Sequence, residues 1–145
     1  MSDFRRITEQ FWASPQIAAA EIEEAHRRGF ALIVNNRPDG ESADQPPGSS
    51  LAAAAEEAGL AYRAIPVTPG GFTVTQVEAM AEALAEARGP VLAFCRSGTR
   101  STLLWALAQA RGGRTPDAIA ADAANGGYDV ASIRPLLEEL ARGSA

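Results

Sequence analysis

The chain of 145 residues has an apolar share of 46% and a net charge of −5 at neutral pH, and this length predicts a single domain over residues 1–145. The acidic balance argues against nucleic acid as a partner, because a phosphate-binding surface needs an excess of basic side chains. One Cys excludes an internal disulfide, one Cys and one His do not complete a zinc site, and no apolar run approaches the roughly 20 residues of a membrane span.

Hydrophobic patterning divides the chain into alternating strands and helices. We expect, in chain order, strands at 4–8 and 11–13, a helix from 14 to 29, a strand at 30–34, a helix at 50–58, a strand at 60–67, a helix from 73 to 87, a strand at 91–94, and helices at 101–110, 116–124 and 129–142. Ser14 is the expected N-cap of the first helix, and Thr73 or Thr75 that of the third. This order predicts an α/β fold with a mainly parallel sheet of four to five strands flanked by helices.

Three loops leave the carboxyl ends of the predicted parallel strands, which is where such sheets bind ligands. They begin at residues 35, 68 and 95. The third loop joins a buried apolar strand to a helix N-terminus and carries Cys95, the only thiol of the chain. We therefore expect the functional site at this edge of the sheet.

The loop from Cys95 to Arg100 has the residue types that activate a thiol. Backbone N–H groups in a tight strand-to-helix loop form a cradle for an anion, and the helix dipole adds positive charge. Arg100 brings a permanent cation with a planar fork of donors. These effects stabilise the thiolate, so Cys95 and Arg100 are the candidate catalytic residues. The candidate anion-binding residues beside them are Arg96, Ser97, Gly98, Thr99 and Ser101.

Three of these loop residues also have an expected local role. Gly98 fits a loop that curls past a ligand without a clashing Cβ. Thr99 or Ser101 can cap the helix that follows, and Ser101 can hydrogen-bond the sulfur. A buried structural cysteine is the alternative interpretation, but it leaves the two neighbouring arginines unexplained.

The Cys-x-x-Gly-x-Arg-Ser pattern of residues 95–101 resembles the active-site loop of rhodanese-type sulfurtransferases and, with one residue fewer, that of Cys-based protein phosphatases. Together with the stretches at 33–41 and 65–71, it resembles the phosphatase-like domain family of beta-lactamase hydrolase-like bacterial proteins. Members of that family are described either as phosphatase-like or as sulfur transferases. The resemblance extends from about Phe4 to Tyr128 and implies a fold like that of the dual-specificity phosphatases.

Departures from the phosphatase pattern favour sulfur transfer. The stretch from Cys95 to Arg100 matches the shorter rhodanese loop, and Phe94 replaces the His that precedes the phosphatase Cys. The 68–71 turn lacks the Asp that protonates the leaving group. We therefore expect a sulfurtransferase in which Cys95 carries a persulfide from a thiosulfate- or persulfide-like donor to a small thiol. The alternative is a phosphatase that forms a thiophosphate on Cys95.

Polar residues on the two other loops complete the candidate site. Arg37 can hold an anionic substrate, Asp39 can orient it or replace the missing phosphatase acid, and Thr68 lies on the remaining loop. A turn held by the Asp39 side chain is the structural alternative. The expected partner is a small sulfur- or phosphate-bearing anion, and we expect a cytoplasmic protein with no cofactor, metal or membrane contact. A third interpretation is a non-catalytic module that binds an anion or senses oxidation.

Overall fold

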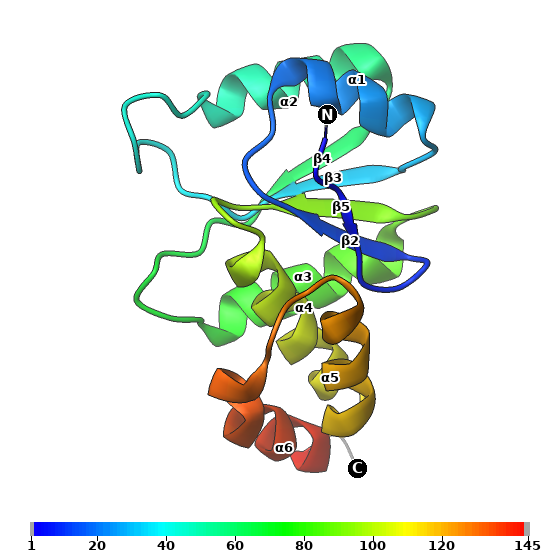
Figure 1. Ribbon diagram of the computed structural model, residues 1–145, viewed down its shortest axis with the longest axis vertical. Coiled ribbons are helices and arrows are strands. Elements are labelled where there is room, and N and C mark those ends of the chain that lie inside the picture. The colour runs from blue at the N-terminus through cyan, green and yellow to red at the C-terminus, as the bar shows by residue number, and fades with distance from the viewer. Residues whose placement is uncertain (1, 144–145) are drawn as a thin grey trace.

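A five-stranded sheet runs through the middle of the molecule (Figure 1). The computed structural model describes residues 2–143. Its strands are β1 (Arg5–Arg6), β2 (Phe11–Ser14), β3 (Leu32–Asn35), β4 (Ala61–Ala64) and β5 (Val91–Phe94). Their order across the sheet is β1-β2-β5-β3-β4, with β1 antiparallel to β2 and every other neighbouring pair parallel. The predicted α/β fold with a mainly parallel sheet is confirmed.

Helices cover both faces of this sheet (Figure 1). They are α1 (Ala19–Arg27), α2 (Gly48–Ala58), α3 (Val74–Glu86), α4 (Thr99–Arg111), α5 (Pro116–Asn125) and α6 (Arg134–Gly143), with the 3-10 helix η1 (Ala131–Ile133) before α6. Helices α1 and α2 pack against one another on one face, and α3 to α6 lie on the other. None of the helices between residues 2 and 143 is long and apolar enough to cross a lipid bilayer.

The central strands β3 and β5 are buried along their whole length and divide the core into two clusters. Successive side chains of a strand point to opposite faces of the sheet. Ile33 and Phe94 join the cluster under α1 and α2, whereas Val34 and Ala93 join the cluster that contains the buried residues of α4. Burial on both faces explains why these strands are continuous apolar runs in the sequence.

The start of α1 differs from the sequence-based prediction, whereas the start of α3 agrees with it. Ser14 is the last residue of β2 and pairs with Phe94, so α1 begins only at Ala19. The Ser14-Pro15 signal is local, and strand pairing with β5 outweighs it. At α3, the Thr73 side chain accepts a hydrogen bond from the Gln76 N–H, as a helix N-cap does.

The start of α4 also differs from the prediction, and this helix borders the candidate site. Its first residue is Thr99, and its N-cap is Gly98 in the left-handed conformation, with φ at +92°. Neither Thr99 nor Ser101 caps the helix, because the tight turn at Gly98 starts it two residues earlier than predicted. The loop that carries Cys95 is therefore very short.

Strands β2, β3 and β5 end at the same level of the sheet. Ser14 and Asn35 both lie opposite Phe94. Directly beyond this level, the Cys95 N–H donates to the Ser14 carbonyl at 3.4 Å, and the Asn36 N–H donates to the Phe94 carbonyl at 2.8 Å. The segments that follow the three strands therefore begin side by side.

Candidate active site

Cys95 is the first residue after β5, and it is buried. The Gly98 N–H donates to the Cys95 Sγ at 3.1 Å. The chain then passes directly into the N-terminus of α4. A peptide N–H and a helix N-terminus both favour a bound anion, and both border Cys95 in this loop.

The carbonyl groups of this loop are tied to neighbouring segments. The Arg96 carbonyl accepts from the Gln16 N–H at 3.2 Å. The Gly98 carbonyl accepts from both the N–H and the hydroxyl of Thr102, at 3.0 and 2.9 Å. In a trans peptide the C=O and the N–H point in opposite directions. The N–H groups that follow the Arg96 and Gly98 carbonyls therefore point away from the groups that hold these carbonyls. When the carbonyls of a loop are bonded elsewhere, the N–H groups of that loop can be oriented toward a bound anion.

Arg100 is held by a carboxylate that the sequence did not identify. Its two terminal nitrogens each donate to Glu41 at 2.8 Å, and Nη1 also donates to the Val67 carbonyl at 2.7 Å. The hydrogen bond to Glu41 is the main cause that raises the pKa of Arg100, and the charge of Cys95 contributes in the same direction. Arg100 therefore lies within electrostatic reach of the thiol while Glu41 orients it.

Arg37 contacts the same carboxylate and is almost fully buried. Its Nε donates to Glu41 at 2.9 Å, its Nη1 to the Gln16 side chain at 3.0 Å and its Nη2 to the Ser42 hydroxyl at 3.3 Å. The hydrogen bonds from Arg100 and then from Arg37 lower the pKa of Glu41 from 4.5 to about 2. Glu41 is thus ionised at neutral pH, and it links the two arginines.

Asp39 and Thr68 make no hydrogen bond to the thiol among the described residues. The Asp39 Oδ1 accepts from the Gly48 N–H at 2.8 Å, at the first residue of α2. This contact is the structural alternative considered for Asp39, a side chain that holds a turn. Thr68 is exposed. Within the described part of the chain, neither side chain hydrogen-bonds to the loop that carries Cys95.

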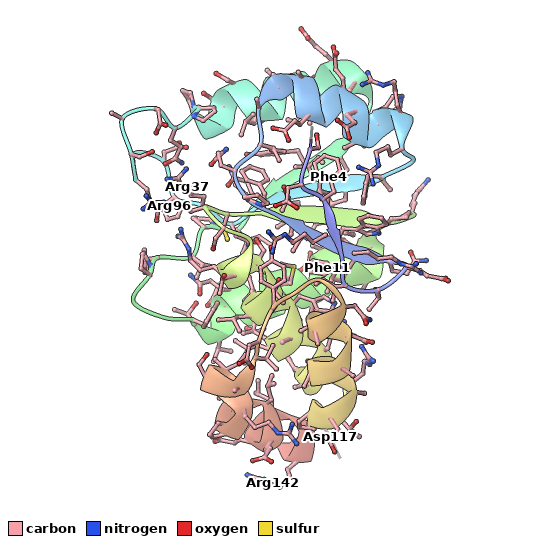
Figure 2. The ribbon with its side chains drawn as sticks, viewed as in Figure 1. Phe4, Phe11, Arg37, Arg96, Asp117 and Arg142 are labelled. Carbon is pink, nitrogen blue, oxygen red and sulfur yellow. The ribbon has the colours of Figure 1, made fainter. Side chains whose placement is uncertain are left out.

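The remaining candidates lie on the rim of the loop or inside it. Arg96, Ser97 and Thr99 are exposed, and Arg96 lies at the same end of the molecule as Arg37 (Figure 2). The Ser101 hydroxyl is buried and has no hydrogen-bond partner among residues 2–143. The bond predicted between Ser101 and the sulfur is therefore not formed in this structure.

Glu41 was not among the site residues predicted from the sequence, although it ends the 33–41 stretch that carries part of the family resemblance. Glu41 lies in a polar, turn-rich loop, 59 positions before the arginine that it contacts. Its spacing of four residues from Arg37 is a signal only within a helix, and this segment is a loop. In the part of the chain that the structure describes, no three His, Cys, Asp or Glu residues gather as a metal site would require.

Sequence comparison relates this chain to one family. The profile of the family described as "Beta-lactamase hydrolase-like protein, phosphatase-like domain" matches residues 3–112. A beta-lactamase hydrolase-like protein of Xylella fastidiosa (strain 9a5c) is 38% identical over 136 residues, which are 93% of this chain and 32% of that protein. One of Agrobacterium fabrum is 38% identical over 109 residues, 75% of this chain and 25% of that protein. The chain spans about a third or less of the length of these relatives.

Solved structures show the same architecture. A Neisseria meningitidis protein proposed to be a phosphatase is 31% identical, with a TM-score of 0.84 over 97% of this chain and 99% of that one. Pseudomonas aeruginosa TpbA in complex with pTyr is 16% identical, with a TM-score of 0.66 over 98% and 90% of the two chains. PTPMT1 in complex with PI(5)P is 13% identical, with a TM-score of 0.73 over 98% and 99%. The fold is that of the Cys-based phosphatases. These matches support the phosphatase alternative better than sulfur transfer, for which they give no evidence.

Proposed function

The chain belongs to the phosphatase-like domain family of beta-lactamase hydrolase-like proteins, and we propose that it is a Cys-dependent enzyme that transfers a small anionic group through Cys95. The backbone N–H groups of the 95–100 loop and the Arg100 side chain bind the anion, and the Cys95 sulfur attacks it. Arg96, Ser97 and Thr99 border the entrance. A reduced thiol is required, so the proposed compartment is the cytoplasm.

The proton supply of the site bears on which group is transferred. A phosphatase must protonate the alkoxide that leaves, and it needs a carboxylic acid for this step. The pKa of Glu41 is about 2, so Glu41 has no proton to donate at neutral pH. Asp39, the other candidate acid, is bonded to the start of α2. This arrangement favours a substrate whose leaving group departs as an anion.

Sulfane sulfur transfer meets this requirement. The Cys95 thiolate attacks the outer sulfur of a thiosulfate-like donor, the S–S bond of the donor breaks, and sulfite leaves with the bonding electron pair. Cys95 then carries a persulfide. An acceptor thiolate attacks the outer sulfur of that persulfide, and the Cys95 thiolate is released. No proton is needed for either leaving group, so the electrostatic environment of the loop suffices for the reaction without a general acid.

Phosphomonoester hydrolysis is the second candidate, and the similarity to solved phosphatases favours it. Here the Cys95 thiolate attacks phosphorus, the ester oxygen leaves, and water then releases phosphate from the thiophosphate. Without an acid, this route is fast only for esters with a good leaving group, such as aryl phosphates. An alkyl phosphate therefore tests whether a general acid exists.

Intact-mass analysis after incubation with thiosulfate tests the preferred reaction. We expect the wild-type chain to become heavier by one sulfur atom and a small thiol to return it to its original mass. Cys95→Ser is the control, and it should gain no sulfur. In parallel, we expect wild type to hydrolyse an alkyl phosphate much more slowly than an aryl phosphate.

Two outcomes would contradict this proposal. Rapid hydrolysis of an alkyl phosphate that is lost in Asp39→Asn, with no sulfur adduct on Cys95, would establish the phosphatase. An absence of both the adduct and any turnover with excess substrate would indicate the non-catalytic module.

A further inference from the structure

Tyr128 contacts the Cys95 loop from a segment outside the family match, which ends at residue 112. It follows α5 and is only 9% exposed. Its hydroxyl donates to the Ser97 carbonyl at 3.0 Å. Burial raises the pKa of Tyr128 above its usual range, so the hydroxyl keeps its proton and remains a donor at neutral pH.

This hydrogen bond reaches the peptide unit whose N–H donates to the Cys95 sulfur. The Ser97 carbonyl and the Gly98 N–H belong to the same trans peptide, and they point in opposite directions. Tyr128 holds the oxygen on one side, while the N–H meets the Cys95 Sγ at 3.1 Å on the other. A rotation of this peptide would break both bonds together.

Gly98 leaves the space that the contact requires. A Cβ at this position would overlap the Tyr128 hydroxyl, and the backbone there has φ at +92°, a conformation that glycine adopts at no steric cost. The tyrosine ring is fixed in turn by Arg5, whose guanidinium carbon lies 5.4 Å from the ring centroid. The Tyr128 hydroxyl thus occupies space that is available because residue 98 has no Cβ.

The other two carbonyls of the loop that are held in place have partners of a different kind. The Arg96 carbonyl is held by a backbone N–H, and the Gly98 carbonyl by Thr102 in the first turn of α4. Neither depends on a side chain from a distant segment. The Ser97 carbonyl depends on Tyr128, 31 residues further along the chain.

We propose that Tyr128 is a positioning residue that sets the orientation of the Ser97–Gly98 peptide, and thereby the hydrogen bond that this peptide donates to Cys95. The inference rests on the proposed nucleophilic role of Cys95, but it holds whichever group Cys95 transfers. Tyr128 acts through the peptide, because its hydroxyl donates to the Ser97 carbonyl rather than to the Cys95 sulfur.

Replacement of the hydroxyl alone tests this role. Tyr128→Phe keeps the ring beside Arg5 and removes the donor to Ser97. We expect alkylation of Cys95 by iodoacetamide at neutral pH to slow by about three- to tenfold, because a hydrogen bond to the charged sulfur is weakened. The difference should disappear at alkaline pH, where the thiol is ionised in both proteins. We also expect the Gly98 amide resonance to shift and its hydrogen exchange to accelerate.

Tyr62→Phe is the matched control, because Tyr62 and Tyr128 are the two tyrosines of the chain. The Tyr62 hydroxyl also donates to a backbone carbonyl, that of Gly48 at 3.3 Å, but at the start of α2. We expect wild-type alkylation rates in this variant. Neither measurement uses a substrate, so failed turnover with thiosulfate or a phosphate ester would count against the proposed reaction alone.

Wild-type alkylation of Tyr128→Phe at neutral pH, together with an unmoved Gly98 resonance, would overturn the proposal. If the variant does not fold, hydrogen exchange of the Gly98 amide in the wild-type chain decides the question. Slow exchange would support a peptide held in one orientation, and exchange at the rate of a free loop would contradict it.

Discussion

Two loops leave neighbouring strands at the same edge of the sheet and build the site in different ways. The loop after β5 contributes its backbone, with the Gly98 N–H on the sulfur and its carbonyls anchored elsewhere. The loop after β3 contributes side chains, because Arg37 and Glu41 form an ion-pair cluster that ends on Arg100. The first loop is the proposed anion cradle, and the second holds the Arg100 side chain through Glu41.

This difference predicts how each loop responds to substitution. A backbone cradle survives most side-chain changes, since every residue except Pro keeps its N–H. An ion-pair cluster depends on each of its members, because removal of one buried partner leaves a charge without compensation. Four experiments on Arg100, Glu41 and Asp39 test this contrast, in order of decreasing expected effect.

Arg100→Lys should have the largest effect. Lysine keeps the charge but loses the planar fork that makes both bonds to Glu41. We expect the inhibition constant for sulfate, measured in a turnover assay, to rise by roughly tenfold or more, as for the loss of one charged hydrogen bond. Arg63→Lys is the control, because Arg63 is a partly buried arginine on β4 that pairs with Glu86. An unchanged inhibition constant would remove Arg100 from the site.

Glu41→Gln preserves shape and removes the negative charge between two arginines. We expect kcat/KM to fall by roughly three- to tenfold as Arg100 loses its orientation, and the free energy of unfolding to fall by about 1–3 kcal/mol. Denaturant unfolding and steady-state kinetics measure these changes. Glu86→Gln, which alters an exposed ion pair, should change stability by less than about 1 kcal/mol. Equal effects of the two variants would show that the cluster has no special role.

The pH dependence of stability should distinguish the wild-type protein from Glu41→Gln. The folded pKa of Glu41 is about 2, below its ordinary value of 4.5. A lowered folded pKa contributes stability that is present above the ordinary value and is lost as the pH falls toward the folded one. We therefore expect wild type to lose more of its melting temperature than Glu41→Gln between these two pH values. Parallel curves of melting temperature against pH for the two proteins would contradict the lowered pKa of Glu41.

Asp39→Ala should have the smallest effect on activity. Loss of the bond to the Gly48 N–H removes a side-chain cap from α2, which costs about 1 kcal/mol. We expect a lower melting temperature with little change in sulfur transfer. Asp44→Ala is the control, because Asp44 bonds to Ser42 within the loop and caps no helix. A large loss of turnover at an unchanged melting temperature would instead identify Asp39 as a general acid.

Where local signals control structure, the sequence was a sufficient guide. Strand β5 has the predicted bounds and Cys95 follows it directly as predicted, whereas the loop from Cys95 into α4 is two residues shorter than predicted, because α4 begins at Thr99. The prediction failed at Ser14, where a correct capping signal competes with the pairing of β2 and β5. A strand edge gains a row of hydrogen bonds from its neighbour, and one capping residue does not outweigh that gain.

The sheet, the helices and the thiol at the end of β5 could be predicted from the residues alone, because they follow from hydrophobic periodicity and from one short loop. The surroundings of that thiol depend instead on tertiary contacts. Glu41 meets Arg100 across 59 positions, Tyr128 meets the Ser97 carbonyl across 31, and Asp39 turns to α2 rather than to Cys95. Side-chain partners at such separations depend on which segments the folded sheet brings together, and no local pattern encodes them.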